Sequence, residues 1–78
     1  MNATKQTANF AVQRYVAPGG AGEIDYVIAE GERVGAVWVG YGEGGTGRLG
    51  FFAAGRGGQH LGHFADQSKA IVAVLNAA

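Results

Sequence analysis

The spacing most suggestive of chemistry lies in the glycine-rich segment GYGEGGTGRLG at residues 40–50. Three of its glycines match G-x-G-x-x-G, which in dinucleotide-binding proteins leads into a helix whose first N–H groups hold a pyrophosphate. The residues that follow here indicate a strand instead. A P-loop also needs Lys and Ser or Thr after its last glycine, where this chain has Arg48-Leu49, and Glu43 would repel phosphate. We therefore predict a flexible hairpin loop.

A second candidate site is the pair His60 and His63 in HLGH. On a helix, imidazoles three residues apart can share a metal ion, but in a strand they point to opposite faces. The chain has no cysteine and no third histidine, so a zinc site would need carboxylate donors. Ser68, the only serine, has no nearby feature of an oxyanion site. We expect no metal, no cofactor, no catalytic residue and no enzyme activity.

The elements that position these residues are short segments with the period of two that is typical of β-strands. Glycine-rich or proline-containing turns such as PGGAG and GRGG separate them. The predicted strands are 9–17, 23–29, 33–41, 48–54 and a short last one at 59–64. In the 33–41 strand the two expected faces are Val34, Ala36 and Trp38 against Val37, Val39 and Tyr41.

The period changes to that of a helix over 65–78, where Asp66 is a candidate N-cap. The expected apolar stripe of this helix is Ile71, Val74, Leu75 and Ala78. The predicted fold class is α+β: a small twisted antiparallel sheet of three to five strands, with one C-terminal helix packed on one face. We expect residues 1–8 to form a flexible tail and 9–78 a single domain.

A helix on one face leaves the other face of the sheet open. One of the adjacent Phe51 and Phe52 should enter the core and the other should lie on the opposite face. An exposed aromatic patch of this kind is typical of an interaction site.

Composition narrows the class of protein. The chain has 78 residues, 47% of them hydrophobic and 15% charged, with 15 glycines. No apolar run reaches the roughly 18 residues of a membrane span, and the first residues lack a signal-peptide core. We expect a soluble cytoplasmic protein without membrane contact.

The charges are unevenly distributed, although the net charge is zero. Residues 23–43 hold five of the six acidic residues and one arginine. Such a distribution favours oriented docking on a charged partner. The predicted partner-binding residues are Glu23, Asp25, Glu30, Glu32 and Glu43, with Trp38 and Tyr41 as aromatic anchors.

Nucleic-acid binding through one face of the sheet is the alternative. Its candidate residues are Arg14, Arg33, Arg48 and Arg56. Phosphate contacts favour a basic protein, so the zero net charge counts against this alternative.

The segment HLGHFADQSKAIVAVLNAA, residues 60–78, resembles the end of the DNA-binding domain of plant ethylene-response factors and of phage integrase arm-binding domains. Leu61, Gly62 and Phe64 match the strand end of that pattern, and Ala70 lies near a usual helix alanine. The resemblance implies a DNA-binding sheet with a helix behind it. The Arg- and Trp-rich first strands that touch DNA in that family are not reproduced.

In its size, its lack of catalytic residues and its acidic 23–43 region, the chain also resembles the small anti-CRISPR proteins of phages and mobile elements. This resemblance implies a non-enzymatic inhibitor that docks through an acidic surface on a protein complex such as a CRISPR–Cas effector complex. We expect the chain itself to be a monomer or a homodimer. We expect a protein that binds and blocks a protein or nucleoprotein complex.

Overall fold

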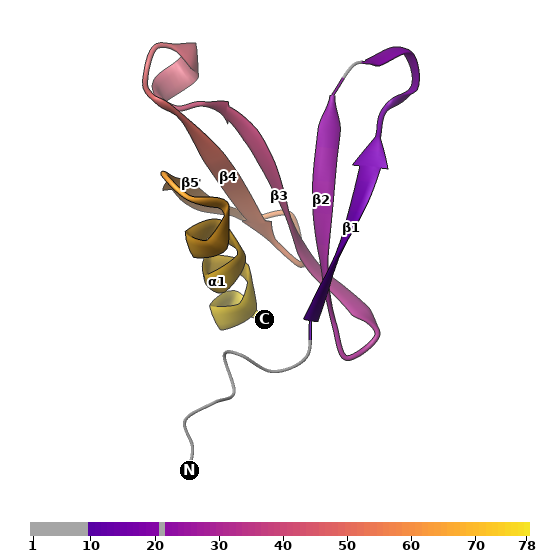
Figure 1. Ribbon diagram of the computed structural model, residues 1–78. Coiled ribbons are helices and arrows are strands. Elements are labelled where there is room, and N and C mark those ends of the chain that lie inside the picture. Colours follow the sequence, from indigo (N-terminus) through magenta and orange to yellow (C-terminus); the bar gives the residue numbers. More distant parts are fainter. Residues whose placement is uncertain (1–9, 21) are drawn as a thin grey trace.

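The computed structural model describes residues 10–20 and 22–78, so the predicted tail 1–8 lies outside the described residues. The described chain forms an antiparallel sheet whose strands lie side by side in chain order, followed by one helix (Figure 1). This confirms the α+β prediction. The elements are β1 (Phe10–Val16), β2 (Glu23–Ala29), β3 (Glu32–Tyr41), β4 (Leu49–Gly55), β5 (His60–Phe64) and α1 (Gln67–Ala77), with short 3-10 turns η2 (Pro18–Gly20) and η3 (Glu43–Gly45).

The helix α1 packs on one face of the sheet, mainly over β3, β4 and β5. Its fully buried side chains are Ala70 and Val74, while Ile71 and Leu75 pack against the core from its edge. The predicted stripe is thus correct except at its end, because Ala78 is exposed. Asp66 occupies the N-cap position, but its side chain makes no capping hydrogen bond.

Small side chains make the core between helix and sheet thin. A Cβ at Gly35 would collide with the Val74 side chain and the Ala54 carbonyl oxygen, so glycine at this position allows the helix to lie close to β3. The fully buried hydrophobic residues of the core are Val27, Val34, Val37, Ala53, Ala70 and Val74.

A β-bulge between β2 and β3 changes the face of one predicted residue. Val27 pairs with Gly35 and Ile28 with Arg33, so Val34 is the extra residue of the bulge. Val34 therefore joins the core beside Val37. The prediction that it shares a face with Trp38 is wrong, because simple alternation does not count the inserted residue.

A second bulge, between β4 and β5, corrects the expectation for the histidine pair. Ala53 pairs with Gly62 and Ala54 with His60, so Leu61 is inserted. The insertion places His60 and His63 on the same face, where both rings contact Phe52. The prediction of opposite faces was wrong for this reason.

The sheet splits into two hairpins at one end (Figure 1). The β2–β3 pairing begins only at Asp25↔Val37, although β2 starts at Glu23 and β3 continues to Tyr41. The pairings β1–β2 and β3–β4 both continue beyond this point. We call the resulting opening, bounded by residues 23–24 of β2 and 38–41 of β3, the interstrand gap.

The middle of the glycine-rich segment, residues 42–48, forms the connection between β3 and β4, and a strand follows it instead of a helix, as predicted. The Gly42 carbonyl oxygen accepts hydrogen bonds from the N–H groups of Gly45 (3.0 Å) and Gly47 (2.8 Å), and the Thr46 hydroxyl donates to the Glu43 carbonyl oxygen (2.9 Å). These N–H groups point back into the loop, so they do not form an anion cradle.

Candidate functional site

The face of the sheet opposite α1 carries a band of aromatic and cationic side chains. Directly paired residues of neighbouring strands point to the same face of a sheet. Tyr26 pairs with Ala36, Trp38 with Phe52 and Phe52 with His63, so these side chains share one face. We call this surface the uncovered face. Its ring-bearing and cationic residues are Tyr15, Tyr26, Arg33, Trp38, Phe52, His60 and His63.

Phe52 is the centre of one half of the uncovered face. The Trp38 ring stacks on it with centroids 5.7 Å apart, and the His63 ring meets it edge-on at 4.6 Å. The His60 ring lies 5.8 Å away on the same phenylalanine. Each aromatic pair of this kind contributes about 0.5–1.5 kcal/mol beyond its burial. The rings therefore fix one another's orientation.

The rings of Phe52 and His63 lie directly over glycine residues of β3 and β4. A Cβ at Gly40 would lie 2.8 Å from a Phe52 ring carbon, and one at Gly50 would lie 2.6 Å from a carbon of the His63 ring. His63 also bonds the Gly40 carbonyl oxygen through Nε2 at 2.9 Å. Because a carbonyl oxygen only accepts, Nε2 carries a proton in this arrangement. Glycine inside strands, a feature that weakens a sheet elsewhere, here makes room for aromatic side chains.

Two tyrosines and an arginine form the other half of the uncovered face. Tyr15 of β1 and Tyr26 of β2 have ring centroids 6.5 Å apart. The guanidinium carbon of Arg33 lies 3.9 Å from the Tyr26 ring centroid, a cation–π contact. Tyr15 and Arg33 are exposed, whereas Tyr26 is half-buried. The face thus continues from β5 across the sheet to β1.

Of the predicted aromatic anchors, Trp38 lies on the uncovered face and Tyr41 does not. Tyr41 pairs with Leu49, and the register places both on the helix side of the sheet. Both side chains are exposed, at 56% and 58%. Phe51 packs against the core and Phe52 lies on the uncovered face, as predicted for this adjacent pair.

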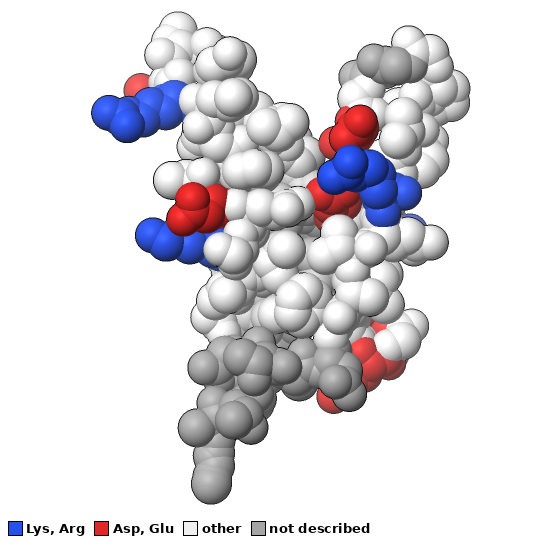
Figure 2. Space-filling view, viewed as in Figure 1, with Lys and Arg blue, Asp and Glu red and all other residues white. Residues whose placement is uncertain are grey.

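The acidic residues do not gather into one surface. Glu30 lies in the turn before β3 and Glu43 in the turn after it, and β3 is 10 residues long. These two carboxylates are therefore separated by the length of a strand, about 30 Å. Glu32 is paired with Arg56, Oε1 to Nη1 at 2.8 Å. Figure 2 shows acidic and basic groups side by side at several places instead of one continuous acidic surface.

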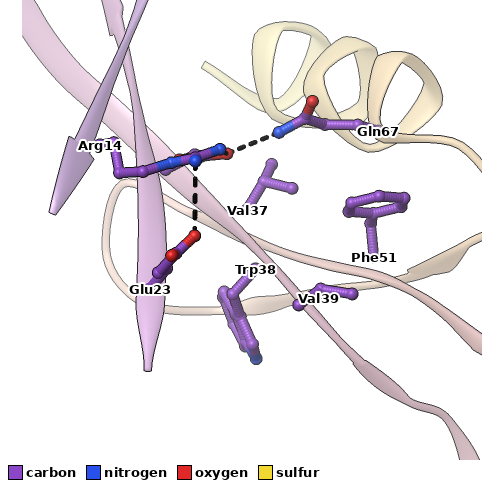
Figure 3. Close-up of a pocket in the computed structure, with 8 residues that line it drawn as sticks. Arg14, Glu23, Val37, Trp38, Val39, Phe51 and Gln67 are labelled. Atoms are coloured by element: carbon purple, nitrogen blue, oxygen red, sulfur yellow. Dashed lines mark hydrogen bonds and ion pairs between the residues drawn. The ribbon is translucent and has the colours of Figure 1, made fainter. Parts of the chain in front are cut away.

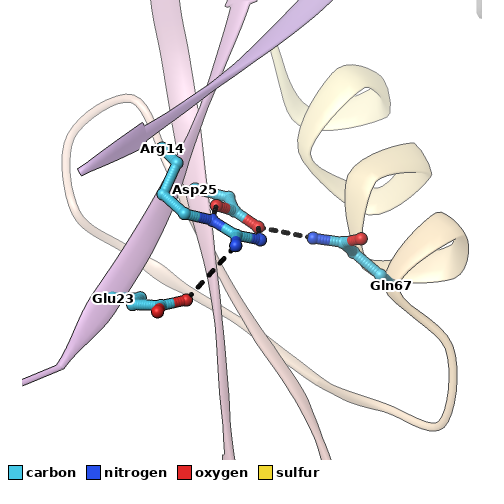
Figure 4. Close-up of polar contacts among 4 residues, drawn as sticks. All are labelled: Arg14, Glu23, Asp25 and Gln67. Atoms are coloured by element: carbon cyan, nitrogen blue, oxygen red, sulfur yellow. Dashed lines mark hydrogen bonds and ion pairs between the residues drawn. The ribbon is translucent and has the colours of Figure 1, made fainter. Parts of the chain in front are cut away.

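Glu23 and Asp25, the other two of the five predicted partner-binding acids, form a cluster with Arg14 (Figure 4). Asp25 is 7% exposed and accepts a hydrogen bond from Arg14 Nε at 2.9 Å and one from Gln67 Nε2 at 2.6 Å. Glu23 Oε1 lies 3.4 Å from Arg14 Nη1. The hydrogen bond with Asp25 and then the charges of Asp25 and Glu23 raise the pKa of Arg14. The cluster ties β1, β2 and the first turn of α1 together.

The four arginines of the nucleic-acid alternative do not share a face. Arg14 is held on the helix side by Asp25, and Arg56 is paired with Glu32. Arg33 is on the uncovered face. Arg48 lines a hollow of about 470 Å³ beside the η3 turn, next to Glu43 and His63. The carboxylates beside three of the four reduce the positive charge available to phosphate.

No group of three or more His, Cys, Asp or Glu side chains within the described residues is arranged to hold a metal ion. Among the described residues, no helix has both the length and the apolar character needed to cross a membrane. No family model matches the chain, and neither a curated protein nor a solved structure matches it.

Proposed function

We propose that the protein is a non-catalytic docking domain that binds and blocks a protein or nucleoprotein complex through the uncovered face. The observation that supports it most is the aromatic band itself, which lies on a sheet face without a second layer of described residues. Tryptophan, tyrosine and arginine are the side chains most enriched among residues that dominate binding energy. The more specific proposal, that the protein inhibits a CRISPR–Cas complex, comes from the resemblance to small anti-CRISPR proteins in size and in the lack of catalytic residues.

The charges of the described residues favour a protein surface over nucleic acid as the partner. A phosphate backbone is held by several unpaired cations. Within the aromatic band Arg33 is the cation, and it already lies over Tyr26. Arg48 lines a hollow together with His63, but Glu43 lines the same hollow. The aromatic rings also stack mainly on one another, which leaves their edges and the outer ring faces for apolar contact.

A pair of charge substitutions on the uncovered face tests the proposal. Arg33→Glu and His60→Glu change two exposed side chains, so the fold should survive. In bacteria that carry a CRISPR–Cas system, the wild-type chain is expected to restore establishment of a targeted plasmid. The double variant should lose at least about tenfold of this effect, the loss typical of a binding hot spot.

Leu49→Glu and Val72→Glu are the matched control, because these exposed side chains lie on the helix side and on the outer surface of α1. The control variant should inhibit like the wild type. Equal inhibition by the Arg33/His60 variant would contradict docking through the uncovered face. If the wild-type chain inhibits none of a panel of CRISPR–Cas types, the proposal that it is a CRISPR–Cas inhibitor is wrong. A mobility shift of duplex DNA that the Arg33/His60 variant abolishes would instead support the nucleic-acid alternative.

A further inference from the structure

We propose that the interstrand gap binds an extended peptide segment as an added strand along β3, with a large apolar side chain next to a basic one. This inference rests on the proposed function, because it assumes that the partner is a protein. It adds a second contact, separate from most of the uncovered face, and names the chemistry of the segment that enters it.

The free backbone edge of β3 is the first observation. Residues 38–41 pair with β4 on one side, from Trp38↔Phe52 to Tyr41↔Leu49. On the other side, the register with β2 ends at Val37, and no other strand of the described residues pairs there. Because alternate residues of a strand turn their N–H and C=O groups to opposite neighbours, and Gly42 N–H bonds toward β4, the groups of Val39 and Tyr41 face the gap and can pair with an added strand. Such pairing needs no change in β3.

Two cavities on opposite faces of the gap are the second observation. A cavity of about 350 Å³ on the side of the uncovered face is bounded by Tyr15, Ile24 and Trp38. A cavity of about 290 Å³ on the helix side is bounded by Arg14, Asp25 and Phe51, among others (Figure 3). Glu23, Trp38 and Val39 line both cavities.

The positions of the cavities fit the geometry of a strand. Consecutive side chains of an extended peptide point to opposite faces of a sheet. Two neighbouring residues of a strand added beside Trp38 and Val39 would therefore enter one cavity each. The aromatic and aliphatic walls of the larger cavity, Tyr15, Ile24 and Trp38, suit an apolar side chain of the size of leucine or phenylalanine.

The charges that line the helix-side cavity determine which peptide side chain suits it. The helix-side cavity is lined by Glu23, Asp25 and Arg14, so its carboxylates exceed its cations by one. Both oxygens of Asp25 are already in contact with Arg14 or Gln67. Glu23 is 56% exposed and its contact with Arg14 is longer, at 3.4 Å. Glu23 is thus the carboxylate available to a lysine or arginine of the peptide.

The test uses an acetylated, amidated hexapeptide of threonine and valine with leucine and lysine at its two central positions. Trp38 is the only tryptophan of the chain and lines both cavities, so its fluorescence reports binding directly. The same peptide with glutamate in place of lysine should bind about tenfold more weakly, since a partly exposed attraction becomes a repulsion. N-methylation of alternate peptide nitrogens should abolish binding if main-chain hydrogen bonds hold the strand.

Variants of the chain locate the contact. Glu23→Gln should weaken the lysine peptide about threefold and leave the glutamate peptide no weaker. Glu32→Gln is the matched control, because Glu32 has the same kind of exposed pair with an arginine but lies outside the gap. Hydrogen exchange of the amides of Val39 and Tyr41, which face the gap, should slow when the lysine peptide is bound.

Equal affinity for the lysine and glutamate peptides, or unchanged exchange at Val39 and Tyr41, would overturn the inference. The two proposals fail separately. Arg33→Glu and His60→Glu lie outside both cavities, so they should leave peptide binding intact while they remove inhibition. Inhibition that depends on Arg33 and His60 in a chain that binds none of the peptides would leave the docking proposal standing and remove the peptide site.

Discussion

Asp25 is the buried charged side chain of the described chain, and its environment explains its position. Burial of a carboxylate costs several kcal/mol unless hydrogen bonds and an opposite charge offset it. Arg14 and Gln67 provide both, from β1 and from the start of α1. The hydrogen bond with Asp25, and then the charges of Asp25 and Glu23, raise the pKa of Arg14, so the stability linked to the protonation of this arginine is present at neutral pH and is lost as the pH rises through the raised pKa.

Asp25→Asn is expected to lower the free energy of unfolding by about 2 kcal/mol. The new amide removes the negative charge and points N–H donors at the donors of Arg14 or Gln67. Urea unfolding followed by circular dichroism measures the change. Glu32→Gln, which breaks an exposed ion pair with Arg56, should cost less than about 0.5 kcal/mol. Equal losses in the two variants would mean that burial of Asp25 has no energetic weight.

At the scale of elements, the turn between β2 and β3 holds an uncommon backbone conformation. Ala29 pairs with Glu32, so two residues form the loop, Glu30 with φ of 52° and Gly31 with φ of 81°. Positive φ at both positions is the type I′ pattern that favours Asn-Gly or Gly-Gly. Glycine suits the second position, whereas glutamate at the first is strained.

Glu30→Asn should therefore raise the free energy of unfolding by about 0.5–1 kcal/mol, because asparagine tolerates this conformation better. Thermal or urea unfolding measures the gain. Glu30→Ala gives the comparison, since it removes the charge without relief of the backbone, and it should bring no gain. Similar stabilisation by alanine and asparagine would assign the effect to charge instead of conformation.

The sequence predicts the strands to within one or two residues, because alternation and turn residues are local signals. The bulges at Val34 and Leu61 were missed, since they depend on which residue of the neighbouring strand lies opposite. The missed bulges explain the wrong faces of Val34 and the histidines. The uncovered face could be expected from Phe51-Phe52, but the burial of Asp25 could not, because its partners Arg14 and Gln67 are distant in sequence.

At the scale of the molecule, stability is unevenly distributed. Every residue of β1 is exposed. The helix α1 packs mainly on β3, β4 and β5, the half of the sheet away from β1. Val27 and Val37, by contrast, have no exposed surface. Segments with few buried apolar contacts open at a lower free energy than the core of the fold.

Native-state hydrogen exchange should therefore separate β1 from the centre of the sheet. Amides of β1 are expected to exchange by local opening, while those of β3 residues 34–37 exchange only with global unfolding. The dependence of the exchange rates on low urea concentrations distinguishes the two routes. Uniform protection across all strands would show that β1 does not open separately from the centre of the sheet.

The outer edge of β1 also has a consequence for the protein in solution. The strand FAVQRYV contains no proline or lysine, and its one charge, on Arg14, is offset by Asp25 of the same molecule. The features that usually prevent unwanted edge-to-edge pairing are thus missing from this strand. The isoelectric point is about 6.7, so charge repulsion between molecules vanishes close to neutral pH. Colloidal stability is consequently lowest near pH 6.7, and concentrated preparations keep best in buffers well away from it.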